Sequence, residues 1–181
     1  MAASYRDAAR GVTLPSAGIV RHYNHRMFTL SPIGVVRSGR TAPEDDYWGE
    51  AGATIELGPD VPAEALDGID EYSHAEIFFI LDRVAETATE RWARHPRGNT
   101  AWPRVGIFAQ RAKVRPNRLA ATIVRIKQRD GRVLRVAGLD AIDGTPVIDI
   151  KPVLREFLPR GEIRQPQWAS ELMRDYWSPP A

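Results

Sequence analysis

The densest group of side chains able to bind a charged ligand lies in one short segment of this 181-residue chain. The segment runs Arg111-Ala112-Lys113-Val114-Arg115-Pro116-Asn117-Arg118-Leu119. An arginine guanidinium binds phosphate or carboxylate through a planar fork of N–H donors. Arg111 ends an apolar run, as a residue on a barrel rim would, and Arg115-Pro116-Asn117 is typical of a rigid turn. The segment is therefore either an anion-binding loop or a solvated basic loop.

A second segment, Leu139–Pro152, alternates acids with apolar residues and reads LDAIDGTPVIDIKP. Asp143-Gly144 is explained as a turn. The turn does not explain the presence of Asp140 and Asp149 among apolar residues. They either pair with the arginine-rich segment or face a cationic ligand.

Two groups of histidines are candidates for other chemistry. His22 and His25 have a spacing that allows shared metal binding on a helix, but no acid lies nearby. Because a metal site needs three or four ligands, we expect no metal here. His74 precedes the most apolar run, and histidine is the residue type most often used for proton transfer. It is either a base or substrate-orienting group, or a histidine with a structural role.

Short apolar or alternating runs separated by turn residues predict the elements that position these groups. The expected strands are Phe28–Val36, Ala53–Leu57, Ala75–Leu81, Val105–Gln110, Ala121–Lys127, Val133–Ala137 and Val147–Ile150. Asp130-Gly131 predicts a hairpin. Helices are expected over Asp82–Ala93 and Gln167–Trp177. The pattern predicts a mainly β protein, an antiparallel barrel or sandwich with few helices.

The net charge of +2 hides a strong segregation of charge along the chain. Residues 41–90 hold fourteen acids and one base, a formal charge of −13. Residues 104–135 hold ten bases and one acid, a formal charge of +9. The basic half is a plausible footprint for nucleic acid or a phosphorylated ligand. Alternatively, the two halves neutralise each other within the fold or across a dimer.

Several classes of protein are excluded by what the sequence lacks. It has no G-x-G-x-x-G or P-loop motif, so a nucleotide-like ligand would have to bind to a site other than a Rossmann fold or a P-loop. It also lacks the G-x-S-x-G motif of serine hydrolases. With no cysteine, disulfides and thiol catalysis are excluded, and a cytoplasmic location is expected. No apolar run approaches the roughly 18 residues of a membrane span. Residues 1–27 lack the layout of a secretory signal and are expected to form an extension.

Five segments in order resemble the TrmO (YaeB/TsaA-like) family. They are Pro32–Ser38, Leu66–His74, Gly106–Arg111, Arg115–Asn117 and Gly138–Pro152. The resemblance implies a barrel domain over residues 28–157, followed by a linker and helix over residues 158–181. It also implies a small antiparallel β-barrel that binds S-adenosyl-L-methionine, acts as a homodimer with the cofactor near the interface, and methylates N6 of threonylcarbamoyladenosine in tRNA.

Carried over by position, the resemblance implies roles for particular residues. The implied cofactor-binding residues are Asp82, Arg83, Arg111, Arg115, Asn117, Leu119, Ala121, Asp140, Ala141, Ile142 and Asp143. Those implied to contact RNA are Arg104, Lys113 and Arg118. His74 is the candidate proton acceptor, and no metal is implied.

This chain departs from the family pattern at two motifs and at its C-terminal end. The family's R-P-N-P-I-G reads Arg115-Pro116-Asn117-Arg118-Leu119-Ala120, its threonine-arginine pair is Gln110-Arg111, and the C-terminal domain of longer members is missing from this sequence. The sequence is therefore consistent with three functions: a tRNA methyltransferase, the same barrel methylating a small molecule, and a non-enzymatic nucleic-acid-binding barrel.

Overall fold

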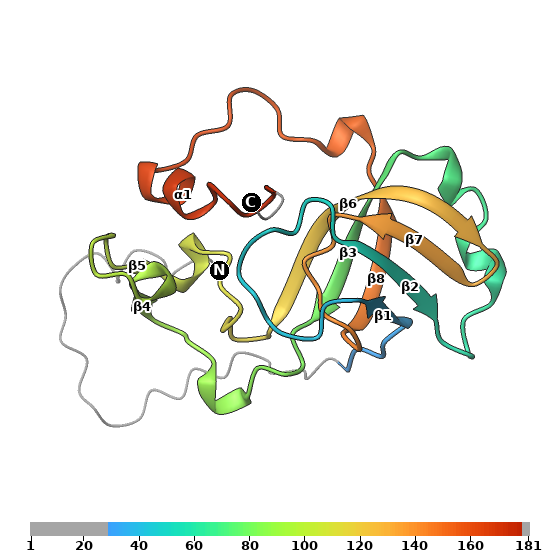
Figure 1. Ribbon diagram of the computed structural model, residues 1–181, viewed down its shortest axis with the longest axis horizontal. Helices are drawn as coiled ribbons and strands as arrows, with labels where there is room; N and C mark the ends of the chain where they lie inside the picture. Colours follow the sequence, from blue (N-terminus) through green and yellow to red (C-terminus); the bar gives the residue numbers. More distant parts are fainter. Residues whose placement is uncertain (1–28, 179–181) are drawn as a thin grey trace, which may run out of the picture.

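The computed structural model describes residues 29–178, most of which belong to or surround a closed β-barrel (Figure 1). The barrel strands are β1 (Gly34–Ser38), β2 (Gly52–Leu57), β3 (His74–Ile80), β6 (Leu119–Asp130), β7 (Val133–Ala137) and β8 (Pro146–Pro152). They close in the order β1-β2-β7-β6-β3-β8, and every neighbouring pair is antiparallel. The expected antiparallel barrel, one of two architectures left open by the strand pattern, is confirmed.

Alternation along each strand separates the core from the outer wall. In β3, Ala75, Ile77 and Phe79 are buried inside the barrel, while His74 is exposed on the outer face. Successive side chains of a strand point to opposite faces, so an apolar residue at every second position fills the barrel. The same pattern in the other strands completes one continuous core, which includes Val36, Ile55, Val124, Leu134, Val136 and Val147.

The strand ends define one rim of the barrel, called here the barrel mouth. Ser38, Ile80 and Ala137 end β1, β3 and β7 there, and Gly52, Leu119 and Pro146 begin β2, β6 and β8. The pairing places these ends together, for example Gly52 opposite Ala137 and Ile80 opposite Leu119. The loops that carry the arginine-rich segment and the Asp140 segment therefore meet at the same rim. The predicted hairpin at Asp130-Gly131 is also confirmed, since it joins β6 to β7.

A short sheet and a helix lie beside the barrel (Figure 1). The sheet pairs β4 (Ala93–Arg94) with β5 (Val105–Gly106), and α1 spans Gln167–Leu172. The indole Nε1 of Trp102 donates a hydrogen bond to Glu171 Oε2 at 2.8 Å, which ties the β4–β5 region to the C-terminal segment. Among residues 29–178, no helix has the length and apolar character needed to cross a membrane.

The helix expected over Asp82–Ala93 is wrong. Only a short 3₁₀ turn, Glu86–Ala88, forms there. The main chain instead bonds to the following loop, with Glu90 N donating to Val114 O at 2.7 Å and the carbonyl of Trp92 accepting from Ile107 N at 3.0 Å. Helix propensity is a weak preference that such tertiary bonds override.

Two strands are several residues longer than expected, β6 by five residues and β8 by three, whereas three other expected elements start late or end early. The strand predicted over Val105–Gln110 stops at Gly106, because Gln110 Nε2 donates to the carbonyls of Arg94 and Val105 and folds residues 107–109 into a 3₁₀ turn. The helix predicted over Gln167–Trp177 ends at Leu172. The first predicted strand begins only at Gly34 in the described chain. Phe28, the 1–27 extension and the His22/His25 pair lie outside the described residues.

Close approach of β1 and β2 makes one glycine essential to barrel closure. A Cβ on Gly34 would lie 2.5 Å from the main-chain oxygen of Glu56. We predict that Gly34→Ala lowers the unfolding free energy by about 1–3 kcal/mol, since such overlap forces the two strands apart. The measurement is urea denaturation. Gly52→Ala is the matched control, because a Cβ there meets nothing within 4 Å, and an equal loss in both variants would contradict the prediction.

Candidate functional site

The carboxylate of Asp140 lies at the barrel mouth, held by two hydroxyl groups. Thr122 Oγ1, on the inner face of β6, and the Tyr176 hydroxyl, from the C-terminal segment, each donate a hydrogen bond to it. No lysine or arginine within residues 29–178 forms an ion pair with Asp140. The side chain is oriented by neutral donors and keeps its negative charge available to a cation.

Main-chain contacts fix the C-terminal segment that carries Tyr176. The carbonyl oxygen of Tyr176 accepts a hydrogen bond from Trp48 N at 2.7 Å, and that of Asp175 accepts one from Tyr47 N at 3.1 Å. A Cβ on Gly49 would lie 2.1 Å from the main-chain oxygen of Trp177, so only glycine allows this approach. Residues 47–49 and 175–177 therefore form one unit above the mouth.

The environment of Tyr176 keeps its hydroxyl protonated. Burial raises the pKa of Tyr176, and the negative charge of Asp140 raises it further. The positive charges of Arg111 and Arg97 act in the opposite direction. A neutral Tyr176 donates to Asp140 throughout the physiological pH range.

The arginine-rich segment folds back on its own main chain at the mouth. Arg111 Nη2 donates to Ala121 O, and Arg115 Nη1 donates to Gln110 O at 2.6 Å. The Arg115 guanidinium also stacks over the Phe108 ring, 5.6 Å from its centroid. The rigid turn predicted at Arg115-Pro116-Asn117 is confirmed by a hydrogen bond from Arg118 N to Arg115 O at 3.0 Å. Neither guanidinium is bound to a carboxylate of the described chain.

Hydrogen bonds hold the loop between β7 and β8 against the neighbouring strand ends. Arg83 donates to Asp143 O at 2.9 Å and to Thr41 O at 3.0 Å. Asp143 Oδ1 accepts a hydrogen bond from Ser38 N at 3.2 Å, and Asp143 N donates to Arg40 O at 2.7 Å. Arg83 and Asp143 thus form the structural frame of the loop that presents Asp140.

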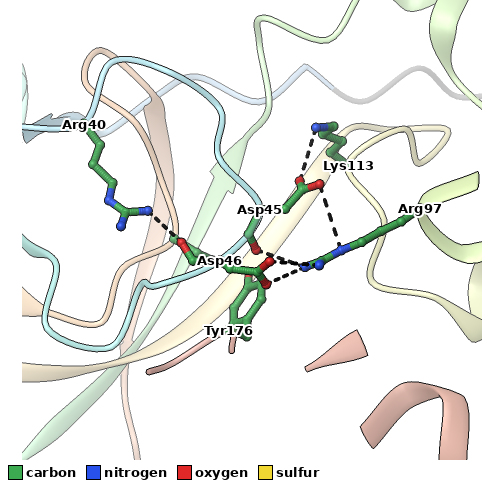
Figure 2. Close-up of polar contacts among 7 residues, drawn as sticks. Arg40, Asp45, Asp46, Arg97, Lys113 and Tyr176 are labelled. Atoms are coloured by element: carbon green, nitrogen blue, oxygen red, sulfur yellow. Dashed lines mark hydrogen bonds and ion pairs between the residues drawn. The ribbon is translucent and has the colours of Figure 1, made fainter. Parts of the chain in front are cut away.

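The acidic loop after β1 is held by three cations, Arg40, Arg97 and Lys113 (Figure 2). Arg97 makes a two-point contact with Asp46, at 2.9 and 2.7 Å, which raises the pKa of Arg97. Lys113 Nζ lies 3.4 Å from Asp45 Oδ1. Arg40 donates to the carbonyls of Asp46 and Tyr47, and its guanidinium lies 4.2 Å from the Trp48 ring centroid. These contacts hold the acidic loop against the β4–β5 region and the arginine-rich segment.

The remaining implied cofactor residues are divided between the mouth and the surface. Leu119 begins β6, Ala121 accepts the bond from Arg111, and Ala141 is buried beside half-buried Ile142. Asn117 is exposed in the turn, and Asp82 is exposed after β3. The structure therefore brings together most of the residues carried over by resemblance.

The residues implied to contact RNA are not grouped together. Lys113 is paired with Asp45, and Arg118 Nη2 lies 3.0 Å from Glu86 Oε1. Arg104 is exposed before β5. It contributes weakly to the lowered pKa of Glu90, whose main cause is the hydrogen bond from Trp92 N.

His74 lies on the outer wall and makes no hydrogen bond with Asp140. It lines an open groove of about 240 Å³ together with Ile123, Arg125, Gly138 and Trp177. A hydrogen bond at 2.8 Å joins its Nδ1 to Ser73 Oγ. Its role as a proton acceptor stays a prediction. Within residues 29–178, no three His, Asp or Glu side chains are grouped as metal ligands.

The departure at Arg118 changes the backbone of the turn. Arg118 adopts φ +52°, a left-handed conformation. Proline, which the resembled family has at this position, is locked near φ −65°. The turn of this chain therefore cannot have the family's backbone at that residue. Here Arg118 instead donates to Val84 O at 2.9 Å and pairs with Glu86.

Sequence reasoning missed Thr122, Tyr176, Arg40 and Arg97. Tyr176 falls within the helix expected over Gln167–Trp177, whereas the chain turns after Leu172 and directs the Tyr176 hydroxyl to the mouth. One sequence feature could have identified Thr122, because it is a polar residue at an inward position of an expected strand. Nothing local in the sequence indicates that Arg97 meets Asp46, 51 residues away.

Comparison with known proteins finds both similar sequences and similar folds. The family described as tRNA-methyltransferase O N-terminal domain matches residues 37–157. A Pyrococcus abyssi protein named "Probable S-adenosyl-L-methionine-binding protein" is 32% identical over 145 residues, covering 76% of this chain and 74% of that protein. The tRNA (adenine(37)-N6)-methyltransferase of Escherichia coli is 37% identical over 103 residues, covering 54% of this chain and 43% of that enzyme.

The crystal structure of TrmO from Pseudomonas aeruginosa has a similar fold, with a TM-score of 0.63 at 28% identity, covering 78% of this chain and 62% of that chain. This chain spans less than half of the length of the E. coli enzyme.

The contact between Tyr176 and Asp140 gives a prediction with a pH dependence. We expect Tyr176→Phe to lower the unfolding free energy by about 1.5–3 kcal/mol, the value of a hydrogen bond to a charged group. Because the folded-state pKa of Tyr176 is raised above 10.0, its stabilisation is fully present below that pH and is lost as pH rises through the folded-state value. The advantage of the unmodified protein should therefore shrink above pH 10.

The measurement is urea denaturation at pH 8 and above pH 10. The control is Tyr72→Phe, because the Tyr72 hydroxyl makes no hydrogen bond with the described residues and its side chain is partly exposed. Equal stability of the two variants at pH 8 would contradict the prediction.

Proposed function

Because this chain belongs to the tRNA-methyltransferase O N-terminal domain family, we propose that it transfers a methyl group from S-adenosyl-L-methionine to a tRNA adenosine. The names of its relatives support this proposal: one is named as binding this cofactor, another as methylating N6 of adenine 37 in tRNA. The sequence resemblance described above further specifies threonylcarbamoyladenosine as the acceptor. A tRNA acceptor would locate the protein in the cytoplasm.

The observation that carries the proposal is the Asp140 carboxylate, which has no ion-pair partner within residues 29–178 and lies on the barrel rim that also carries Arg111 and Arg115. Asp140 is held by hydroxyl donors alone, which leaves its charge available to the cationic sulfonium or ammonium of the cofactor. Arg111 and Arg115 suit the cofactor's carboxylate, since a guanidinium binds it through two N–H groups. The donor set at the mouth therefore fits a ligand that carries both signs of charge.

The protein's own residues mainly bind and orient. When bound, S-adenosyl-L-methionine supplies an already activated methyl group, so positioning is the protein's chief contribution. Arg83 and Asp143 hold the loop that presents Asp140, and Tyr176 fixes the direction of its carboxylate. Asn117, exposed in the turn, is available to hydrogen-bond the adenine of the cofactor.

Calorimetric titration with S-adenosyl-L-methionine and S-adenosylhomocysteine tests the cofactor site. We expect Asp140→Asn to weaken S-adenosyl-L-methionine binding about 10- to 100-fold, because a charge-assisted contact is worth about 1.5–3 kcal/mol. Asp149→Asn is the matched control from the same segment, since the Asp149 carboxylate contacts only Ile150 N and Lys151 Nζ among residues 29–178. An unchanged dissociation constant for Asp140→Asn would remove this carboxylate from the site.

A methyl-transfer assay tests the acceptor. The protein should move labelled methyl groups from S-adenosyl-L-methionine to tRNA, and nucleoside mass spectrometry should find the label on N6 of the modified adenosine. The left-handed Arg118 favours a second candidate, the same barrel acting on a small-molecule acceptor, because the turn beside the mouth differs from that of the resembled family. Cofactor binding without label in tRNA would support this second candidate.

We further propose that the chain forms a homodimer through the surface around Trp92 and Phe108. These side chains are 76% and 75% exposed, and Ile107, next to Phe108, bonds to the carbonyl of Trp92. Exposed aromatic surface of this kind is typical of interfaces, and the contact of Arg115 with Phe108 connects this surface to the barrel mouth.

Sedimentation velocity should show a dimer, and the double variant Trp92→Ser/Phe108→Ser should be a monomer. A dimer that persists in this double variant would contradict the proposed surface.

A further inference from the structure

Ion pairs within the fold neutralise much of the basic segment, residues 104–135. Four of its ten cations pair with acids of residues 41–90, at 2.6 to 3.4 Å. These pairs are Lys113–Asp45, Arg118–Glu86, Arg125–Glu50 and Arg129–Asp67. Arg111 and Arg115 bond to main-chain carbonyls at the mouth. Neither Lys127 nor Arg135 has an ion-pair partner within residues 29–178, and both line the same groove.

Strand register aligns this groove across the outer wall of the barrel. Arg37 of β1 lies opposite Thr54 of β2, and Thr54 lies opposite Arg135 of β7. Arg135 in turn lies opposite Gln128 of β6, where an irregularity between Ile126 and Gln128 adds Lys127 to the strand. Neighbouring strands lie about 4.8 Å apart, so the row spans about 14 Å. The row defined by Arg37, Thr54, Arg135 and Lys127 is called here the cationic row.

The groove is open and leads to the barrel mouth. It has a volume of about 580 Å³, and its lining includes the cationic row together with Ser38 and Asp143. Ser38 ends β1 at the mouth, where its N–H donates to Asp143 Oδ1. The strands β1, β2, β7 and β6 that carry the groove lie side by side in Figure 1. An elongated ligand in the groove would therefore approach Asp140 from outside the barrel.

The charges around the groove favour a polyanion over a single enclosed anion. Arg37 is paired with Glu56 at 3.1 Å, but both side chains are about half exposed, and such a surface pair is weak enough to exchange for another anion. Long exposed cations on an open surface follow the phosphates of a nucleic acid backbone. No aromatic side chain lines the described groove, which argues against base stacking there.

We propose that the cationic row binds the phosphodiester backbone of the RNA acceptor and guides it to the barrel mouth. This inference rests on the proposed function, since it assigns an RNA-binding surface to the same reaction. It names Lys127 and Arg135, which have no acid partner within residues 29–178, as the principal phosphate contacts, ahead of Lys113 and Arg118, each of which has one.

The test measures binding of an unmodified tRNA transcript by fluorescence anisotropy over a series of salt concentrations. The double variant Lys127→Ala/Arg135→Ala should bind less tightly, and its plot of log affinity against log salt should be shallower by about two units, roughly one per lost phosphate contact. Lys127→Arg/Arg135→Lys keeps both charges and should retain the original slope. Arg160→Ala is the matched control, an exposed arginine in the linker after the barrel.

Binding of S-adenosylhomocysteine separates failure of this inference from failure of the proposed function. The double variant should keep the unmodified protein's affinity for S-adenosylhomocysteine, which also verifies its fold. An unchanged tRNA affinity and salt slope in a double variant that methylates tRNA normally would overturn the cationic row alone. A protein that binds the cofactor but no tRNA would overturn both the cationic row and the tRNA acceptor.

Discussion

The organisation of the barrel mouth depends on one carboxylate, Asp140, held by hydroxyls from distant parts of the chain. Thr122 comes from the barrel wall and Tyr176 from the C-terminal segment. A half-buried carboxylate must accept hydrogen bonds to offset its lost hydration. Asp140 accepts them from two hydroxyl groups and forms no ion pair with a lysine or arginine of the described chain. The barrel gives Asp140 a rigid base, and the C-terminal segment completes its surroundings.

Segregated charge explains how one small fold presents two opposite surfaces. Seven of the fourteen acids of residues 41–90 form ion pairs within residues 29–178, as in the Asp45–Lys113 and Asp46–Arg97 contacts. This pairing confirms neutralisation within the fold, one of the two interpretations of the charge pattern. It is nevertheless incomplete, because a negative charge remains at the mouth and positive charges remain on the outer wall. The proposed division is a mouth that binds the cofactor and a wall that binds RNA.

The sequence predicted those parts of the fold that follow from local alternation. The strand at Ala75–Leu81 and the Asp130-Gly131 hairpin were predictable because an apolar run bounded by turn residues and a turn dipeptide are local signals. The helix predicted over residues 82–93 was wrong because the main chain of this segment forms hydrogen bonds with residues 107 and 114. Helix propensity does not account for such long-range bonds. The mouth residues were found through family resemblance, whereas Tyr176 and Arg97 are brought there by long-range packing.

The central claim is that the cofactor binds at the barrel mouth, and amide chemical shifts measured during titration with S-adenosylhomocysteine test it most directly. The largest perturbations are predicted at residues 111–122, 138–144 and 175–177, which meet around Asp140. The amides at the far end of the β6–β7 hairpin, residues 129–133, should remain unperturbed. Perturbations concentrated in that hairpin or on the outer faces of β1 and β2, with none around Asp140, would contradict the claim.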